Sequence, residues 1–135
     1  MSPTEIHAGI TDTGNRFRRG LYLSETKAGN LMEISGNTAG RILYEMNDVQ
    51  ISNLLDLTDA RIIEQLGTTF EQMKRIGAGN RYEFTHEIAI WARNNGYSGI
   101  KFYGAQSTNN YVNFVIFEQS TVNSAIRNNF NRVNW

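Results

Sequence analysis

The chain has 135 residues, of which 40% are apolar and 11% aromatic, enough for the core of one domain and too many for wholesale disorder. It has no cysteine, which excludes a disulfide scaffold, a thiolate zinc site and a cysteine nucleophile. Thirteen basic and thirteen acidic side chains cancel, so no net charge favours a nucleic-acid partner, and no apolar run approaches the roughly 18 residues of a membrane span. We expect a single domain over residues 1–135.

The first half of the chain predicts short elements separated by turns. A loop-rich entry over residues 1–19 comes first. Ser24 is a predicted helix N-cap, and apolar residues at helical spacing indicate a helix that Gly36 ends. The predicted strands of this half are residues 20–24, 42–46 and 49–55.

The second half predicts three helices and two buried strands. Thr58 and Asp59 begin a helix that Gly67 closes, and Thr68 with Glu71 forms a capping-box pattern for the next one. The apolar spacing over 82–95 predicts the longest helix. Buried strands are expected at 100–103 and 112–117, and residues 120–135 are compatible with helix or strand. Because strands and helices do not alternate regularly, this order favours an α+β fold over a doubly wound sheet.

Histidines and paired carboxylates offer little support for acid–base or metal chemistry. His7 and His86 are far apart, with no second histidine four residues from either, so a packed or surface role is expected for both. Asp56 and Asp59 flank Thr58 at a predicted helix start. Helix capping accounts for them without a catalytic role.

The densest basic cluster is formed by Arg16, Arg18 and Arg19 around Phe17. An arginine there can bind phosphate bidentately, which suits a nucleotide-binding site and equally a ribonuclease. A loop of solvated arginines explains the composition just as well, so the residues alone leave both interpretations open.

Taken in order, several segments of the chain resemble RES domains, and the match spans about residues 6–118. The first are Asn15-Arg16-Phe17, Leu21-Tyr22-Leu23-Ser24 and, nine residues later, Glu33. The later ones are Leu54–Asp59, Leu66-Gly67, Tyr82–Thr85, Ala92-Arg93, Gly96–Ile100, Asn113 and Phe117. No single motif is specific; the resemblance lies in their order and spacing.

The resemblance implies a compact, ADP-ribosyltransferase-like mixed sheet with flanking helices, and an activity that consumes NAD⁺ by splitting the nicotinamide–ribose bond, as an NAD⁺ glycohydrolase or phosphorylase. NAD⁺ is then the substrate, with no prosthetic group and no metal. The chain looks most like the RES domains at the C-terminus of contact-dependent or Rhs-type polymorphic toxins. That implies a larger secreted or surface-exposed parent toxin, a cognate immunity protein and action in the cytoplasm of a target cell.

The resemblance also assigns roles to individual residues. Arg16, Tyr22 and Glu33 match the arginine, strand tyrosine and glutamate of the family and are the expected catalytic residues. Gly104 stands where the family has a serine and has no hydroxyl group. The Gly104 amide or the Ser107 hydroxyl is the candidate replacement for the serine hydroxyl. Substrate binding is assigned to Arg16, Tyr22, Tyr82, Gly104, Ser107 and Asn113.

Three other functions remain open at this stage. The same fold can transfer ADP-ribose to a protein or nucleic acid instead of hydrolysing NAD⁺. A ribonuclease toxin would use the arginine cluster, although the neutral charge argues against it. The third function is a module that binds NAD⁺ without turnover, and the glycine at position 104 in place of the family's serine favours it.

Overall fold

A four-stranded mixed sheet forms the centre of the computed structural model, which describes residues 16–46, 51–79, 82–105, 110–126 and 130–135. Its strands lie in the order β1 (Leu21–Ser24), β5 (Val112–Ile116), β4 (Gly99–Tyr103) and β3 (Leu54–Asp56). β5 is antiparallel to both neighbours, whereas β3 is parallel to β4. A separate antiparallel ribbon pairs β2 (Leu43–Met46) with β6 (Phe130–Val133). The expected α+β class, with a mixed sheet and flanking helices, is confirmed.

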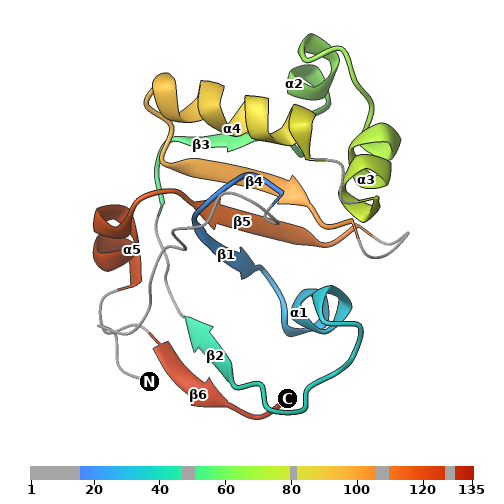
Figure 1. Ribbon diagram of the computed structural model, residues 1–135. Coiled ribbons are helices and arrows are strands. Elements are labelled where there is room, and N and C mark those ends of the chain that lie inside the picture. Colours follow the sequence, from blue (N-terminus) through green and yellow to red (C-terminus); the bar gives the residue numbers. More distant parts are fainter. Residues whose placement is uncertain (1–15, 47–50, 80–81, 106–109, 127–129) are drawn as a thin grey trace.

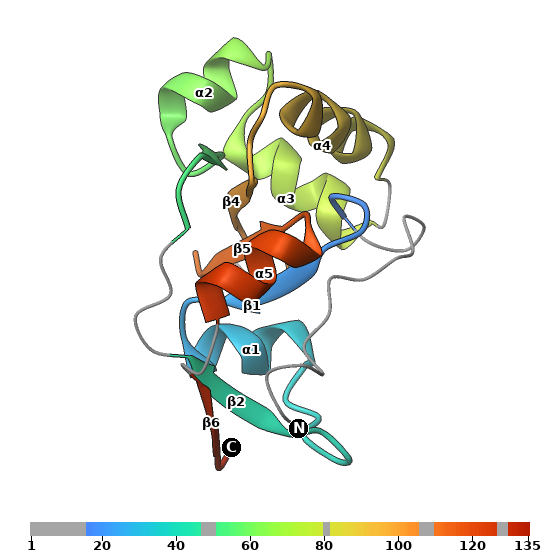
Figure 2. The same ribbon diagram turned by 90° about the vertical axis from the view of Figure 1, so that its left-hand side faces the viewer.

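Five helices flank these strands in the described part of the chain: α1 (Lys27–Glu33), α2 (Ala60–Gln65), α3 (Phe70–Ala78), α4 (Glu83–Asn94) and α5 (Gln119–Ile126). The three helices between β3 and β4 gather beside those two strands (Figure 1). In the view turned by 90° (Figure 2), α5 lies beside β5 and β1, and α1 lies between β1 and the β2–β6 ribbon. None of the helices that the structure describes is long and apolar enough to cross a membrane.

The core follows from the alternation of side chains along the central strands. Ile100 and Phe102 of β4 and Val115 of β5 face one side of the sheet and are buried with residues of α2, α3 and α4. Ile116 faces the other side, where it is buried with Val122 of α5. The two faces of the sheet therefore support two apolar clusters, and the larger contains Phe17, the neighbour of Arg16.

Two helices begin one or two residues later than the sequence predicts. The N-cap of α1 is Thr26, not Ser24, because Ser24 still belongs to β1 and the next amide, Glu25 N–H, donates to the Val112 carbonyl. The N-cap of α3 is Thr69, not Thr68, because the Thr68 amide closes α2 by donating to the Ile63 carbonyl. In each case the backbone is still occupied by the preceding element.

The third predicted strand is shorter than expected, and the C-terminal segment is both helix and strand. Within the predicted range 49–55, the described residues 51–53 are outside β3, and Asn53 has a positive φ of 57°, which is incompatible with an extended strand. Residues 47–50 lie outside the described part. In the range 120–135, α5 is followed by β6, so both alternatives are realised in succession.

Candidate functional site

A cleft of about 290 Å³ lies where the edge of the sheet meets α1 and α3. Five predicted site residues line it although they are far apart in the sequence: Arg16, Tyr22, Glu33, Tyr82 and Asn113. Its volume is at the lower end of the roughly 300–1,000 Å³ of small-molecule pockets. The fold therefore brings most of the predicted site together on one concave surface.

The Arg16 guanidinium is held by two backbone carbonyls. Its Nη1 donates to the Tyr103 carbonyl at the end of β4, and its Nη2 donates to the Met73 carbonyl in α3, each at 2.8 Å. The guanidinium carbon also lies 5.3 Å from the centres of the Phe17 and Phe102 rings. Burial lowers the pKa of Arg16 from its usual value, while Glu33 and three nearby tyrosines oppose that shift. Arg16 is a fixed, partly desolvated cation.

Gly77 of α3 makes room for this arginine. A Cβ atom at position 77 would lie 2.9 Å from Arg16 Nε and 2.8 Å from the Ala105 Cβ. Arg16 Nε itself is buried and has no hydrogen-bond partner among the described residues. A guanidinium has five N–H donors, so after two bonds to carbonyls and one buried Nε–H, one N–H remains on each terminal nitrogen.

Glu33 is the last residue of α1 and has an anchored carboxylate. Its Oε1 accepts a hydrogen bond from the Tyr111 hydroxyl at 2.7 Å and another from Asn113 Nδ2 at 2.8 Å. The Asn113 Oδ1 in turn accepts from the Ser24 hydroxyl. Oε2 of Glu33 makes no hydrogen bond within the part of the chain that the structure describes. One oxygen is thus fixed by the protein, and the other is available to a ligand.

Tyr22 uses its hydroxyl to shape the loop that carries Arg16. The hydroxyl accepts from the Phe17 amide at 2.9 Å and donates to the Arg18 carbonyl at 2.7 Å. Its ring meets that of Phe102 edge-on, with centroids 6.3 Å apart. Since the Tyr22 hydroxyl is hydrogen-bonded to the backbone, Tyr22 would contact a substrate through its aromatic ring.

Arg93 holds the same loop from α4. It donates to the Arg19 carbonyl at 2.6 Å, pairs with the Glu118 carboxylate at 2.7 Å and lies over the Phe117 ring at 4.4 Å. Of the three clustered arginines, Arg16 lines the cleft and Arg18 and Arg19 do not. The cluster is therefore not one phosphate-binding patch.

Replacing Tyr22 by Phe is expected to destabilise the fold by about 1–3 kcal/mol at neutral pH, because the Phe17 amide loses its acceptor. Burial raises the pKa of Tyr22 above its usual value of about 10. The folded protein thus holds this proton more tightly than the unfolded chain, so the stabilisation is present below about pH 10 and is lost as the pH rises further. Urea unfolding from pH 7 to 11 should show a smaller alkaline decline for Tyr22→Phe than for the wild type. Equal declines would contradict this account.

Of the predicted site residues not yet described, Tyr82 lines the cleft and Gly104 does not. Tyr82 precedes α4, and its ring lies 5.9 Å from that of His86. Gly104 is buried, does not line the cleft, and its amide donates to the Tyr111 carbonyl at 2.9 Å. Ser107 lies outside the described residues.

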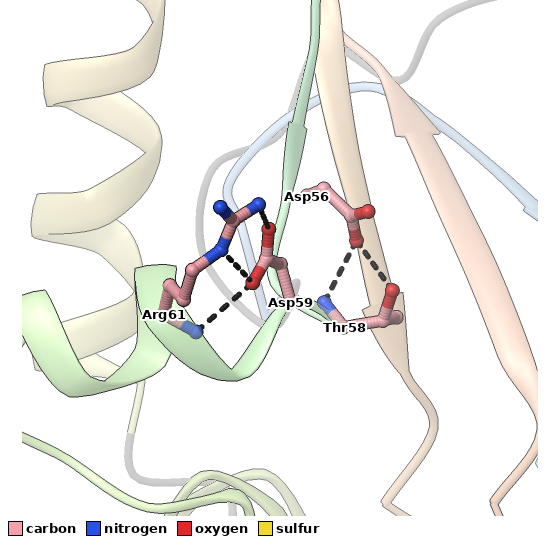
Figure 3. A network of polar contacts seen from close by, with 4 residues as sticks. All are labelled: Asp56, Thr58, Asp59 and Arg61. Atoms are coloured by element: carbon pink, nitrogen blue, oxygen red, sulfur yellow. Dashed lines mark hydrogen bonds and ion pairs between the residues drawn. The ribbon is translucent and has the colours of Figure 1, made fainter.

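Helix capping, expected for both carboxylates at the start of α2, is confirmed for Asp59 and not for Asp56, which bonds to Thr58 ahead of the helix. Asp59 is the N-cap, accepts from the Arg61 amide at 2.9 Å and pairs with the Arg61 guanidinium at 3.1 Å. Asp56 accepts from the Thr58 amide and hydroxyl (Figure 3). Each carboxylate thus bonds to the residue two positions later in the sequence, Asp56 to Thr58 and Asp59 to Arg61. No group of histidine and carboxylate side chains suited to a metal ion exists among the described residues.

Sequence reasoning missed Tyr111, Ser24 and Gly77, which complete the site. Ser24 and Asn113 are register partners across β1 and β5, and Tyr111 immediately precedes β5. The sequence signal for these residues was Asn113, a polar residue inside the apolar run at 112–117. A buried asparagine needs hydrogen-bond partners, and Asn113 is buried in the structure.

Comparison of the chain with protein-family models, with curated proteins and with solved structures gave no match. The resemblance to RES domains therefore rests on the sequence motifs alone.

Proposed function

We propose that the chain is an NAD⁺-consuming toxin domain with an ADP-ribosyltransferase-like fold, which cleaves the bond between nicotinamide and ribose. The observation that carries this proposal is the meeting of Arg16 and Glu33, from separate elements, in one cleft lined by Tyr22, Tyr82 and Phe102. A cation, a carboxylate and aromatic rings are the groups that a positively charged nicotinamide nucleotide with a diphosphate would require.

The proposed reaction breaks the C–N bond, and nicotinamide leaves with the bonding electron pair. Positive charge then develops on the ribose, and water adds at that carbon and releases a proton. A fixed carboxylate stabilises this oxocarbenium-like state more than the ground state, which lowers the barrier. Glu33 supplies such a group, because Oε1 is anchored by Tyr111 and Asn113 while Oε2 makes no bond to the described residues.

Arg16 is the proposed diphosphate ligand. The two carbonyl bonds fix its orientation and leave one N–H on each terminal nitrogen for phosphate oxygens. The size of the cleft suits the reacting half of the dinucleotide, with the adenosine half extending beyond it.

Arg16→Lys is expected to raise KM for NAD⁺ about 10- to 100-fold, because a lysine keeps the charge but loses the paired donors. It also removes the two carbonyl bonds, so the free energy of unfolding should fall by about 2 kcal/mol. Steady-state kinetics at a temperature where the variant remains folded separate the two effects. Arg61→Lys, at an exposed ion pair, is the control. An unchanged KM for folded Arg16→Lys would remove Arg16 from substrate binding.

The experiment that tests the function follows NAD⁺ carrying one label on nicotinamide and another on the adenylate. Purified chain is incubated with water alone, with phosphate, or with a cell extract. Free ADP-ribose indicates hydrolysis and ADP-ribose 1-phosphate indicates phosphorolysis. Adenylate label on a macromolecule supports the alternative function, ADP-ribose transfer. Intact NAD⁺ under all three conditions overturns the proposal.

The ribonuclease alternative gains no support from the cleft. Among the described residues that line it, Arg16 is the one cation, and histidine is not represented. A larger parent toxin, a cognate immunity protein and action in a target-cell cytoplasm belong to the same proposal, and they follow from the resemblance alone.

A further inference from the structure

Tyr111 is a buried residue at the entrance to β5 that the sequence did not single out. The residue is 8% exposed, and its hydroxyl donates to Glu33 Oε1 at 2.7 Å. Burial lowers the pKa of Arg16, and Tyr111 is among the nearby groups that oppose that shift. Tyr111 thus lies beside both charged residues of the cleft and is bonded directly to one of them.

Two glycines form the slot that holds the Tyr111 ring. A Cβ atom at Gly29 of α1 would lie 3.2 Å from the ring, and a Cβ atom at Gly104 would lie 2.0 Å from it. The Cβ at position 104 would also be 2.5 Å from the Tyr111 hydroxyl oxygen. The ring and hydroxyl therefore occupy the space that any side chain at position 104 would need.

The hydroxyl acts on a carboxylate that would otherwise be poorly fixed. Glu33 is exposed at the end of α1, where a glutamate has several accessible rotamers. Tyr111 and Asn113, which flank Val112 in the sequence, both donate a hydrogen bond to the same oxygen of Glu33, Oε1. This pair of donors selects one orientation of the carboxylate, with Oε2 left for the substrate.

We propose that Tyr111 is the positioning residue for Glu33 and that the Gly29–Gly104 slot exists to place its hydroxyl. This inference rests on the proposed function and deepens it: the hydroxyl comes from the residue just before β5, and it lies 2.5 Å from where a Cβ atom at position 104 would be, the position at which RES domains have a serine. Tyr111 acts through Glu33 and does not itself react.

The test compares Tyr111→Phe, Glu33→Gln and the double variant in NAD⁺ cleavage. Phenylalanine keeps the ring in its slot and removes the hydroxyl alone. We expect kcat to fall about 10- to 100-fold with KM little changed, because substrate binding by Arg16 is retained. In the Glu33→Gln background the same substitution should change kcat less than about threefold, because its effect passes through the Glu33 carboxylate. Tyr97→Phe, whose ring packs on Trp91, is the control and should keep wild-type kinetics.

The outcomes separate this inference from the proposed function. A wild type that leaves NAD⁺ intact overturns both. If the wild type is active and Glu33→Gln is impaired, but folded Tyr111→Phe retains full kcat, the positioning role alone is overturned. A kcat loss from Tyr111→Phe that is equally large in both backgrounds means that Tyr111 acts independently of Glu33, which also overturns it.

Discussion

Glu33→Gln should lower kcat for NAD⁺ cleavage by about 10³-fold, equivalent to about 4 kcal/mol of transition-state stabilisation, while leaving the fold intact. Glutamine keeps an oxygen that can accept from Tyr111 and Asn113, so the network around Oε1 is retained. What changes is the charge, together with the replacement of the second oxygen by an NH₂ group. Since positive charge develops on ribose mainly in the transition state, KM should change less than kcat.

The measurement is initial-rate kinetics with nicotinamide release as the signal, beside thermal unfolding of each variant. Glu87→Gln removes an exposed carboxylate of α4 that does not line the cleft, and it should behave as the wild type. A folded Glu33→Gln protein that cleaves NAD⁺ at the wild-type rate would exclude Glu33 from the chemistry. A loss shared by Glu87→Gln would indicate a general charge effect instead.

Elements with strong local signals could be predicted from the sequence nearly residue by residue. The helix predicted at 82–95 is Glu83–Asn94, and the strands expected at 100–103 and 112–117 are Gly99–Tyr103 and Val112–Ile116. In these segments apolar periodicity and burial agree. Prediction failed at helix starts, where two residues one or two positions apart are equally good N-caps and the hydrogen bonds of the preceding element decide between them.

The candidate site was predictable in its residues but not in its connections. The resemblance named Arg16, Glu33 and Asn113 separately. Their relation depends on the register of β1 against β5, which sets Ser24 opposite Asn113, and no local pattern in the sequence encodes that register. The role of Tyr111 depends on the same long-range pairing, so it became visible only in the folded chain.

The sequence also gave no physical reason for glycine at position 104, and the structure supplies one that predicts a large effect on stability. Gly104→Ala would bring a Cβ atom to 2.0 Å from Tyr111 Cε2 and 2.1 Å from Cζ. The Gly104 amide is bonded to the Tyr111 carbonyl, so the backbone cannot easily move away from the ring. We expect the free energy of unfolding to fall by about 3 kcal/mol, near the upper end of what overpacking costs. Urea unfolding at neutral pH measures this loss.

A double-mutant cycle identifies the ring as the cause. Tyr111→Ala empties the slot and should itself cost about 3 kcal/mol or more through the cavity it leaves. Adding Gly104→Ala to that variant should then cost less than about 1 kcal/mol, because the new methyl group enters vacated space. Gly67→Asn is the control: φ there is +72°, a conformation that asparagine tolerates, and nothing lies within 4 Å, so stability should hardly change. If Gly104→Ala costs as much without the ring as with it, strain in the backbone just after β4 limits position 104. The glycine would then be unrelated to the placement of the Tyr111 hydroxyl.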